Sequence, residues 1–214
     1  MIERIILLLL LIVFINNYYF IFKYSWETKF NFYRSLMCLY FSFYSLEIIL
    51  DIIFKNNSIS NIIYNTDIIN NTDIIEWFKS YLILDIFYMM WNKSKRWDLY
   101  IHHIWSLINY YNCYNCYNFF HIFVLINESI SIVSGLDSYA LENKDFLLSK
   151  KYKKIRINII NYIRRPIWII TIFFILYYKS SINIFIFYQS LLTCICMLLL
   201  DYYWYKKCLK IINL

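Results

Sequence analysis

Long apolar stretches separated by short polar and basic segments run through the whole chain. A helix that crosses a bilayer needs about 20 mostly apolar residues, and seven stretches approach or exceed this length. They are Ile2–Phe22, Ser35–Phe54, Ile75–Trp91, Leu99–Tyr111, Phe119–Gly135, Ile167–Tyr178 and Ile182–Tyr203. The fourth and the sixth are the shortest. The pattern predicts an all-α fold, a polytopic membrane bundle of about seven transmembrane helices.

Composition supports a membrane protein with a single bundle. Of the 214 residues, 61% are hydrophobic and 16% are charged, whereas soluble domains average about half and about a quarter. The first stretch is either a signal peptide or an uncleaved anchor, and the absence of a small-residue cleavage site before "NNYYF" favours the anchor. We therefore expect residues 1–29 to form an N-terminal transmembrane anchor or signal anchor, and residues 30–214 to form the main domain.

Basic residues divide unevenly between the two sides of such a bundle. If the connecting segments alternate from side to side, 17 of the 21 Lys and Arg residues fall on one side. The other four are Arg4, Lys55, Lys79 and Lys179. Because cytoplasmic loops carry the excess of Lys and Arg, the bias predicts a cytosolic C-terminus. The opposite side holds residues 55–74, with N-glycosylation patterns at Asn56 and Asn70.

Three further features refine this topology. The net charge of +7 is spread over short loops and includes no basic-aromatic module, so no nucleic-acid partner is expected. Residues 141–168 alternate basic and apolar positions, which predicts either an interfacial helix along the headgroups or a charged loop. Cys113 and Cys116 have the spacing of a zinc or redox pair, but a single pair within a repeated "YNCYNC" segment indicates a connector instead.

Titratable residues inside the apolar stretches are the main candidates for a functional site. Such groups are costly in a membrane and usually face the interior of a helix bundle. The chain has eight of them: Glu47, Asp51, Asp85, His102, His103, His121, Glu128 and Asp201. Glu47 and Asp51 lie one turn apart near the end of their stretch, where their side chains can reach the interface.

Helical geometry suggests how some of these residues are arranged. Asp98 lies one turn before His102, so its carboxylate could hold one imidazole nitrogen and leave the other free as a base. His103 points about 100° away and cannot share that task. His121 and Glu128 lie two turns apart on one helical face. A functional site and a structural hydrogen-bond network both remain open for these residues, and no metal site is expected because a third ligand is missing.

The order of several sequence blocks resembles the TLC-domain family of multi-pass membrane proteins, closest to its small members. The blocks cover about residues 30–212, which makes 30–214 the TLC domain under this resemblance. They are "FYRSLMCLYFS", "SYLILDIFYMMW" with Asp85, the double-histidine block "RWDLYIHHIWSLINYY", the Glu-Ser block "LINESISIVSGLDSYAL", "INYIRRPIWIITIFF" and "LLLDYYWYKKCLKII". The resemblance implies a six-helix core behind the N-terminal anchor, and a location in the endoplasmic reticulum or another cellular membrane.

The family resemblance also implies a function connected with lipids. We expect the chain to bind or redistribute membrane lipids, with Asp85, Asp98, His121 and Glu128 forming a lipid site or polar core, and with no cofactor. In the ceramide synthase branch the two histidines are associated with N-acylation of a sphingoid base by fatty acyl-CoA. An enzymatic alternative therefore assigns catalysis to His102 and His103 with that acyl donor. A transporter or cargo receptor of the early secretory pathway is a second alternative.

The chain also departs from the synthase pattern. Those enzymes carry an acidic cluster soon after the histidines, whereas no carboxylate precedes Glu128 here. The homeobox-like insert of some synthases is absent as well. For these reasons lipid binding is the primary expectation and acyl transfer the alternative.

Overall fold

The computed structural model describes residues 2–17, 23–54, 72–112, 121, 123–181 and 183–213, and every regular element in this part of the chain is helical. The α-helices are α1 (Ile2–Asn17), α3 (Trp26–Phe54), α6 (Thr72–Trp91), α7 (Trp97–Asn112), α9 (Ser129–Glu142), α10 (Phe146–Ile159), α11 (Arg165–Tyr177) and α12 (Ile184–Ile212). Shorter elements are the 3-10 helices η1 (Leu125–Glu128) and η3 (Lys179–Ser181) and the π-helix η2 (Ile160–Arg164). The prediction of an all-α fold is confirmed.

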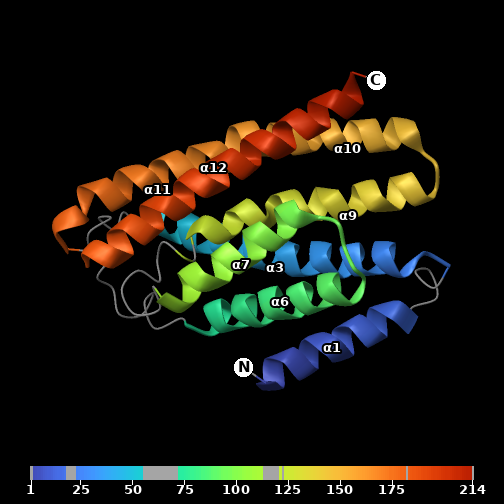
Figure 1. Cartoon of the computed structure of the whole chain (residues 1–214), viewed down its shortest axis with the longest axis horizontal. Coiled ribbons are helices and arrows are strands. Elements are labelled where there is room, and N and C mark those ends of the chain that lie inside the picture. Colours follow the sequence, from blue (N-terminus) through green and yellow to red (C-terminus); the bar gives the residue numbers. More distant parts are fainter. Residues whose placement is uncertain are drawn as a thin grey trace.

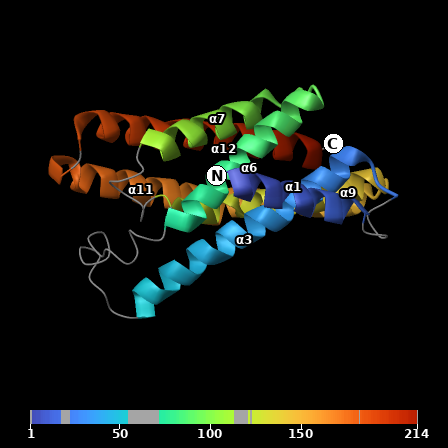
Figure 2. The ribbon, with the colours of Figure 1, turned by 90° about the horizontal axis from the view of Figure 1, so that it is seen from below.

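The helices run roughly along one axis and alternate in direction (Figure 1). The α6–α7 and α9–α10 turns and the C-terminus lie toward the same end of the bundle, at the right in Figure 1. α3 packs against α9, α6 against α7, and α12 against α7, α10 and α11, while α1 lies beside α6 and α3. Figure 2 shows α3 crossing below the pair formed by α7 and α12.

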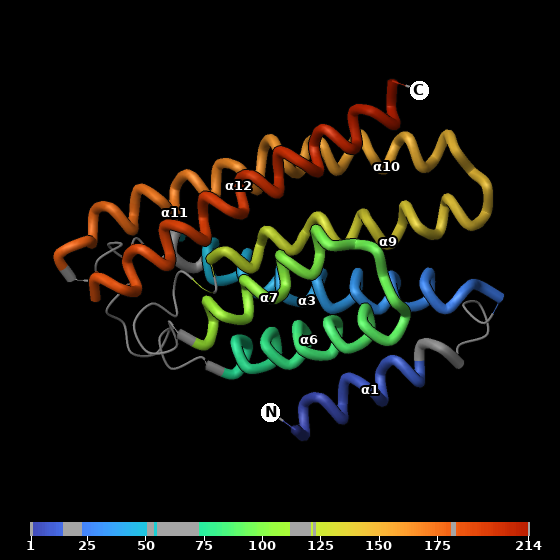
Figure 3. The backbone as a smooth tube through the Cα atoms, in the orientation of Figure 1, coloured from blue at the N-terminus to red at the C-terminus, as the bar shows by residue number. Residues whose placement is uncertain are grey.

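One continuous helix of 32 residues, Phe146–Tyr177, contains α10, η2 and α11. Its path is plain in the backbone tube of Figure 3. Of the two structures expected over residues 141–168, the loop is wrong, because this segment is helical from Phe146 onward. Helix α10 packs on α9 and α12, and its position along the lipid headgroups stays a prediction. Pro166 has no amide to bond the carbonyl four residues earlier, and the chain passes this point through the π turn Ile160–Arg164 without breaking.

Within the described residues, two helices, Phe146–Tyr177 and Ile184–Ile212, are long and apolar enough to cross a membrane. The bundle of about seven transmembrane helices stays a prediction. The surface and the interior are also distributed as in a membrane protein. Large apolar side chains are exposed on several helices, including Phe43, Phe87, Phe173 and Leu199. Charged side chains are buried between the same helices, as described below. Extensive exposed apolar surface of this kind is rare on monomeric soluble proteins.

The single glycine of the chain lies where α3 and α9 cross. A Cβ atom at Gly135 would overlap the Ser35 hydroxyl and would lie 2.7 Å from the Asn31 carbonyl oxygen. The Ser35 hydroxyl also approaches the carbonyl oxygens of Ser131 and Ile132 on α9, at 3.2 and 3.1 Å. Small residues let two helix backbones approach closely, as is common in membrane bundles. This crossing fixes the position of α9, which follows directly after Glu128.

Candidate functional site

Helix α7 turns its two histidines inward and its isoleucines outward. His102 and His103 are buried, whereas Ile101, Ile104 and Ile108 are each about half exposed. A helix of this kind packs its polar face against neighbouring helices and leaves its apolar face to the surroundings. Both histidines therefore point into the bundle, as the sequence predicted for intramembrane titratable groups.

His103 belongs to a buried ionic cluster that joins three helices. Its Nδ1 atom lies 2.8 Å from Oδ2 of Asp85 on α6. Nε of Arg34 on α3 donates a hydrogen bond of 2.6 Å to the other oxygen of the same carboxylate, and Nη1 of Arg34 donates to Oδ1 of Asn31 at 2.9 Å. The Asp85 carboxylate is fully buried. Because the carboxylate is shared between a guanidinium and an imidazole, His103 is held as a structural group.

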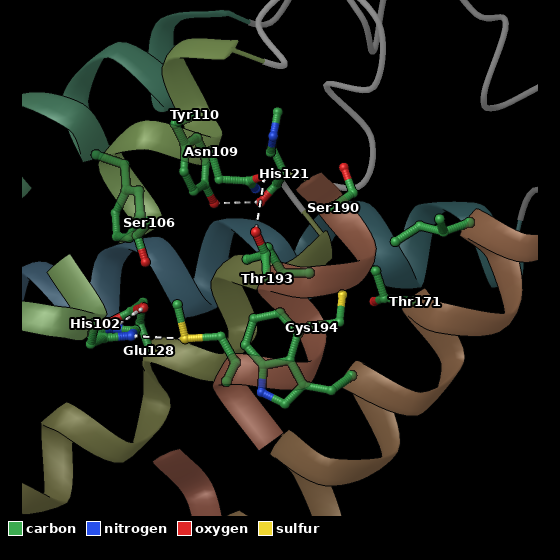
Figure 4. A pocket seen from close by; sticks show the side chains of 15 residues that line it. His102, Ser106, Asn109, Tyr110, His121, Glu128, Thr171, Ser190, Thr193 and Cys194 are labelled. Atoms are coloured by element: carbon green, nitrogen blue, oxygen red, sulfur yellow. Dashed lines mark hydrogen bonds and ion pairs between the residues drawn. The ribbon is translucent and has the colours of Figure 1, made fainter. Parts of the chain in front are cut away.

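His102 has different neighbours on α12 and in η1. Its Nε2 atom lies 3.5 Å from Oε1 of Glu128, and its Nδ1 atom lies 3.3 Å from Sδ of Met197. Figure 4 shows the imidazole beside the Glu128 side chain, with a dashed line from the ring nitrogen to the sulfur atom. The ring also meets Trp204 edge-on, with centroids 5.7 Å apart. The Glu128 carboxylate thus lies beside the ring, where a carboxylate can orient an imidazole.

The prediction that Asp98 orients His102 is wrong. Asp98 instead accepts hydrogen bonds from Arg96, with Nε at 2.9 Å and Nη2 at 2.7 Å, and from Nε1 of Trp204 at 2.8 Å. Asp98 lies in front of the predicted span. Burial raises the pKa of its carboxyl group, but the hydrogen bonds and positive charge of Arg96 outweigh this effect and hold the pKa at about 2. Asp98 is therefore a permanent anion that joins the start of α7 to α12.

The predicted α-helical face shared by His121 and Glu128 is also not formed as expected, because residues 125–128 are a 3-10 helix. The His121 ring stacks on Tyr110 at 4.5 Å between centroids, and the Tyr110 hydroxyl donates to the His121 carbonyl oxygen at 2.9 Å. Figure 4 shows His121 and Glu128 well separated. His121 thus belongs to a different part of the polar interior from the His102–Glu128 pair.

Arg164 and Asp201 form a second buried ion pair, of which the sequence analysis identified only Asp201. Asp201 was among the intramembrane candidates, but Arg164 was counted with the cytosolic loops, and it is fully buried. Its Nε donates to Oδ1 of Asp201 at 2.7 Å, and Nη1 donates to the carbonyl oxygen of Asn127. The guanidinium also lies over Trp204, 5.3 Å from the ring centroid. A buried carboxylate needs a counter-charge, so the lone Asp201 in an apolar helix was the signal for this partner.

Two cavities meet at His102. The larger has a volume of about 770 Å³ and lies among α3, α9, α10, α12 and the α6–α7 turn. Many of its lining residues are basic, and it lies toward the end of the bundle that carries the basic turns. The smaller has a volume of about 60 Å³ and lies deeper, with Glu128, Ser106, Thr193 and Trp168 in its wall (Figure 4). Apolar atoms form most of the wall of the small cavity. His102 lines both.

The remaining candidates are placed as follows. Glu47 is exposed, and the side chain of Asp51 lies outside the described part of the chain, as do Asn56, Asn70 and the pair Cys113 and Cys116. Within the described residues, no group of three or more His, Cys, Asp or Glu side chains could hold a metal ion.

Comparison with known proteins finds no relative. No family model matches the chain, and neither a curated protein nor a solved structure is significantly similar to it. The resemblance to the TLC-domain family therefore remains a prediction from six sequence blocks.

Proposed function

We propose that this chain is a multi-pass integral membrane protein of the TLC type that binds one membrane lipid across the two cavities that meet at His102. The observation that carries the proposal is that His102 lies in the wall of both cavities. A basic, roomy cavity suits a headgroup, and the smaller, mainly apolar cavity behind His102 suits hydrocarbon. The lipid would place the junction between headgroup and chain beside His102 and Glu128.

The surface of the bundle supports a membrane location. Apolar side chains are exposed along α3, α6, α7, α11 and α12, and a large continuous apolar surface favours contact with lipid tails. The 32-residue helix is about 48 Å long at about 1.5 Å per residue, which exceeds the hydrocarbon thickness of about 30 Å. Its basic first half, within α10, would therefore extend into the headgroup region on the cytosolic side.

The orientation rests on the distribution of basic residues. The turn at residues 92–96, helix α10 and the last turns of α12 together carry 11 of the 21 Lys and Arg residues. The turn, the start of α10 and the end of α12 lie toward one end of the bundle (Figure 1). The positive-inside rule assigns that end to the cytosol. The membrane would be that of the endoplasmic reticulum or another cellular compartment.

Acyl transfer is the second candidate, and the contact between His102 and Glu128 favours it. In this mechanism neutral His102 takes a proton from the amine of a lipid base while the amine nitrogen attacks the thioester carbonyl of a fatty acyl-CoA. The carbon–sulfur bond breaks, an amide forms, and the thiolate of CoA leaves toward the large cavity. His103 would take no part, because it is held by Asp85, whose other carboxylate oxygen binds Arg34.

Variants at the two histidines separate the two candidates. Wild type, His102→Phe and His103→Phe are purified from membranes at matched levels, and their bound lipids and cellular lipid pools are measured by mass spectrometry. For a binder, His102→Phe alters the bound lipid without any change in acyl amides. For an acyltransferase, an enlarged acyl-amide pool disappears in His102→Phe.

The folded fraction of each variant, from size-exclusion chromatography, serves as the control. His103→Phe should lower this fraction, because it leaves the Asp85 charge with one partner fewer, while the folded molecules keep the lipid. Wild-type protein that retains no lipid and leaves all lipid pools unchanged would overturn both candidates.

A further inference from the structure

We propose that the large cavity is a phosphate site, in which Arg156, Lys207 and Lys150 bind the phosphate of an anionic membrane lipid. The proposal rests on the lipid-binding function above and names the headgroup class for the same cavity. It is carried by the excess of cations over carboxylates among the described residues that line the cavity.

The charges around the cavity do not balance. Its lining includes eight Lys and Arg residues but only two carboxylates, Glu27 and Asp137. Four of the cations have a carboxylate partner: Arg34 with Asp85, Arg96 with Asp98, Lys153 with Asp137 and, at the longer distance of 3.9 Å, Arg156 with the same Asp137. The other four are Lys93, Lys95, Lys150 and Lys207. Like charges gathered around a partly enclosed space repel one another, and an anion in that space would relieve the repulsion.

Arg156 is the central group of this site. Its nearest carboxylate oxygen is Oδ2 of Asp137, 3.9 Å from Nη1. Asp137 is already occupied, because Lys153 Nζ lies 2.8 Å from both of its oxygens and Ser149 donates to Oδ1 at 2.6 Å. The Nε atom of Arg156 is buried and has no hydrogen-bond partner among the described residues. The side chain as a whole is 15% exposed and lines the cavity, so the guanidinium offers a ligand there hydrogen-bonding capacity that the described residues leave unfilled.

Cations from separate elements converge on the same space. Arg156 comes from α10 and Lys207 from α12, and the positive charges of Arg96 and Arg156 act on Lys207 together with the negative charge of Asp98. Lys207 also lies 5.8 Å from the centroid of the Tyr203 ring. Arg96 is fixed by Asp98, which also accepts a hydrogen bond from Trp204, so the Arg96 guanidinium stays in place at the edge of the site.

Phosphate fits this arrangement better than a single carboxylate. A guanidinium presents a planar fork that matches two phosphate oxygens, and lysines on other sides can reach the remaining oxygens. The cavity lies at the end of the bundle assigned to the cytosol, where anionic phospholipids are concentrated and attract basic groups. A phosphate ester on a lipid would enter at headgroup depth with its chains directed toward His102.

The test compares two lipids that differ only in the phosphate. Full-length protein in detergent is titrated with phosphatidic acid and with diacylglycerol of the same acyl chains, and binding is measured by native mass spectrometry. We expect phosphatidic acid to bind at least about tenfold more tightly, and Arg156→Gln and Lys207→Gln each to weaken its binding by about tenfold. Lys154→Gln is the matched control, since it removes one charge from an exposed position on the same helix.

The outcomes separate the phosphate site from the lipid-binding function. Equal binding of both lipids, unchanged in Arg156→Gln, would overturn the phosphate site and leave lipid binding in place. Failure of wild-type protein to bind either lipid would overturn both. Competition identifies the source of the phosphate: displacement of phosphatidic acid by coenzyme A but not by equimolar inorganic phosphate would support the site with a soluble phosphoester as its ligand. Retention of phosphatidic acid against both would support the membrane lipid.

Discussion

At the scale of single residues, Asp85 controls the packing of three helices because its carboxylate is the common partner of Arg34 and His103. Asp85→Asn removes the charge and leaves the Arg34 guanidinium, which is 15% exposed, without its counter-ion. We expect the free energy of unfolding to fall by about 3–5 kcal/mol, measured by thermal or denaturant unfolding in a mild detergent.

The double variant Arg34→Gln, Asp85→Asn removes both charges together. It should recover part of the lost stability, because no isolated charge remains buried. If the two substitutions were simply additive, the ionic coupling between α3 and α6 would be disproved.

Sequence reasoning at this scale found the titratable residues but not their partners. The inward orientation of His102 and His103 followed from their position in an apolar stretch. Their contacts did not, because Asp85 and Glu128 are brought to them by other helices. Asp98 was assigned to His102 from its spacing along one helix, but Arg96 is only two residues away and offers it two charged hydrogen bonds. Local spacing cannot decide between such competitors.

At the scale of helices, the crossing of α3 and α9 depends on the missing side chain at Gly135. Gly135→Ala would force a methyl group against the Ser35 hydroxyl and the Asn31 carbonyl oxygen. The two helices would have to move apart. We expect the free energy of unfolding to fall by about 1–3 kcal/mol, measured by thermal or denaturant unfolding in a mild detergent.

Ser35→Ala in the Gly135→Ala background should restore only part of this loss. It removes the hydroxyl group but not the backbone carbonyl, which stays 2.7 Å from the added carbon atom. Stability equal to that of wild type in Gly135→Ala alone would contradict the close packing.

Helix positions could be predicted from hydropathy, and helix ends could not. The apolar stretches mark most of the helices, because burial in lipid or in the bundle requires apolar residues. α3 begins at Trp26 rather than Ser35, and α12 extends to Ile212 rather than Tyr203, since backbone hydrogen bonding continues into the polar ends. The sequence did not predict that α10 and α11 form one continuous helix, because a basic stretch before Pro166 is typical of a loop.

At the scale of the whole molecule, the orientation of the bundle in the membrane determines from which compartment the large cavity is accessible. The sequence-based charge count included Arg34 and Arg164 among loop residues, but both belong to buried ion pairs. When these two residues are left out of the count, most of the remaining Lys and Arg residues still fall on one side. The cavity therefore opens toward the side that holds the C-terminus.

Two inserted tags test this orientation directly. One tag follows Leu214 and the other is placed between Asn57 and Ser58, in the segment between α3 and α6. In sealed vesicles of the endoplasmic reticulum, whose cytosolic face is outside, we expect added protease to remove the C-terminal tag. The internal tag should survive until detergent opens the vesicles, because positive loops are retained on the cytosolic side. The reverse pattern would place the large cavity on the lumenal side, and with it the proposed phosphate site. Cleavage of both tags in intact vesicles would instead contradict an odd number of membrane crossings between them.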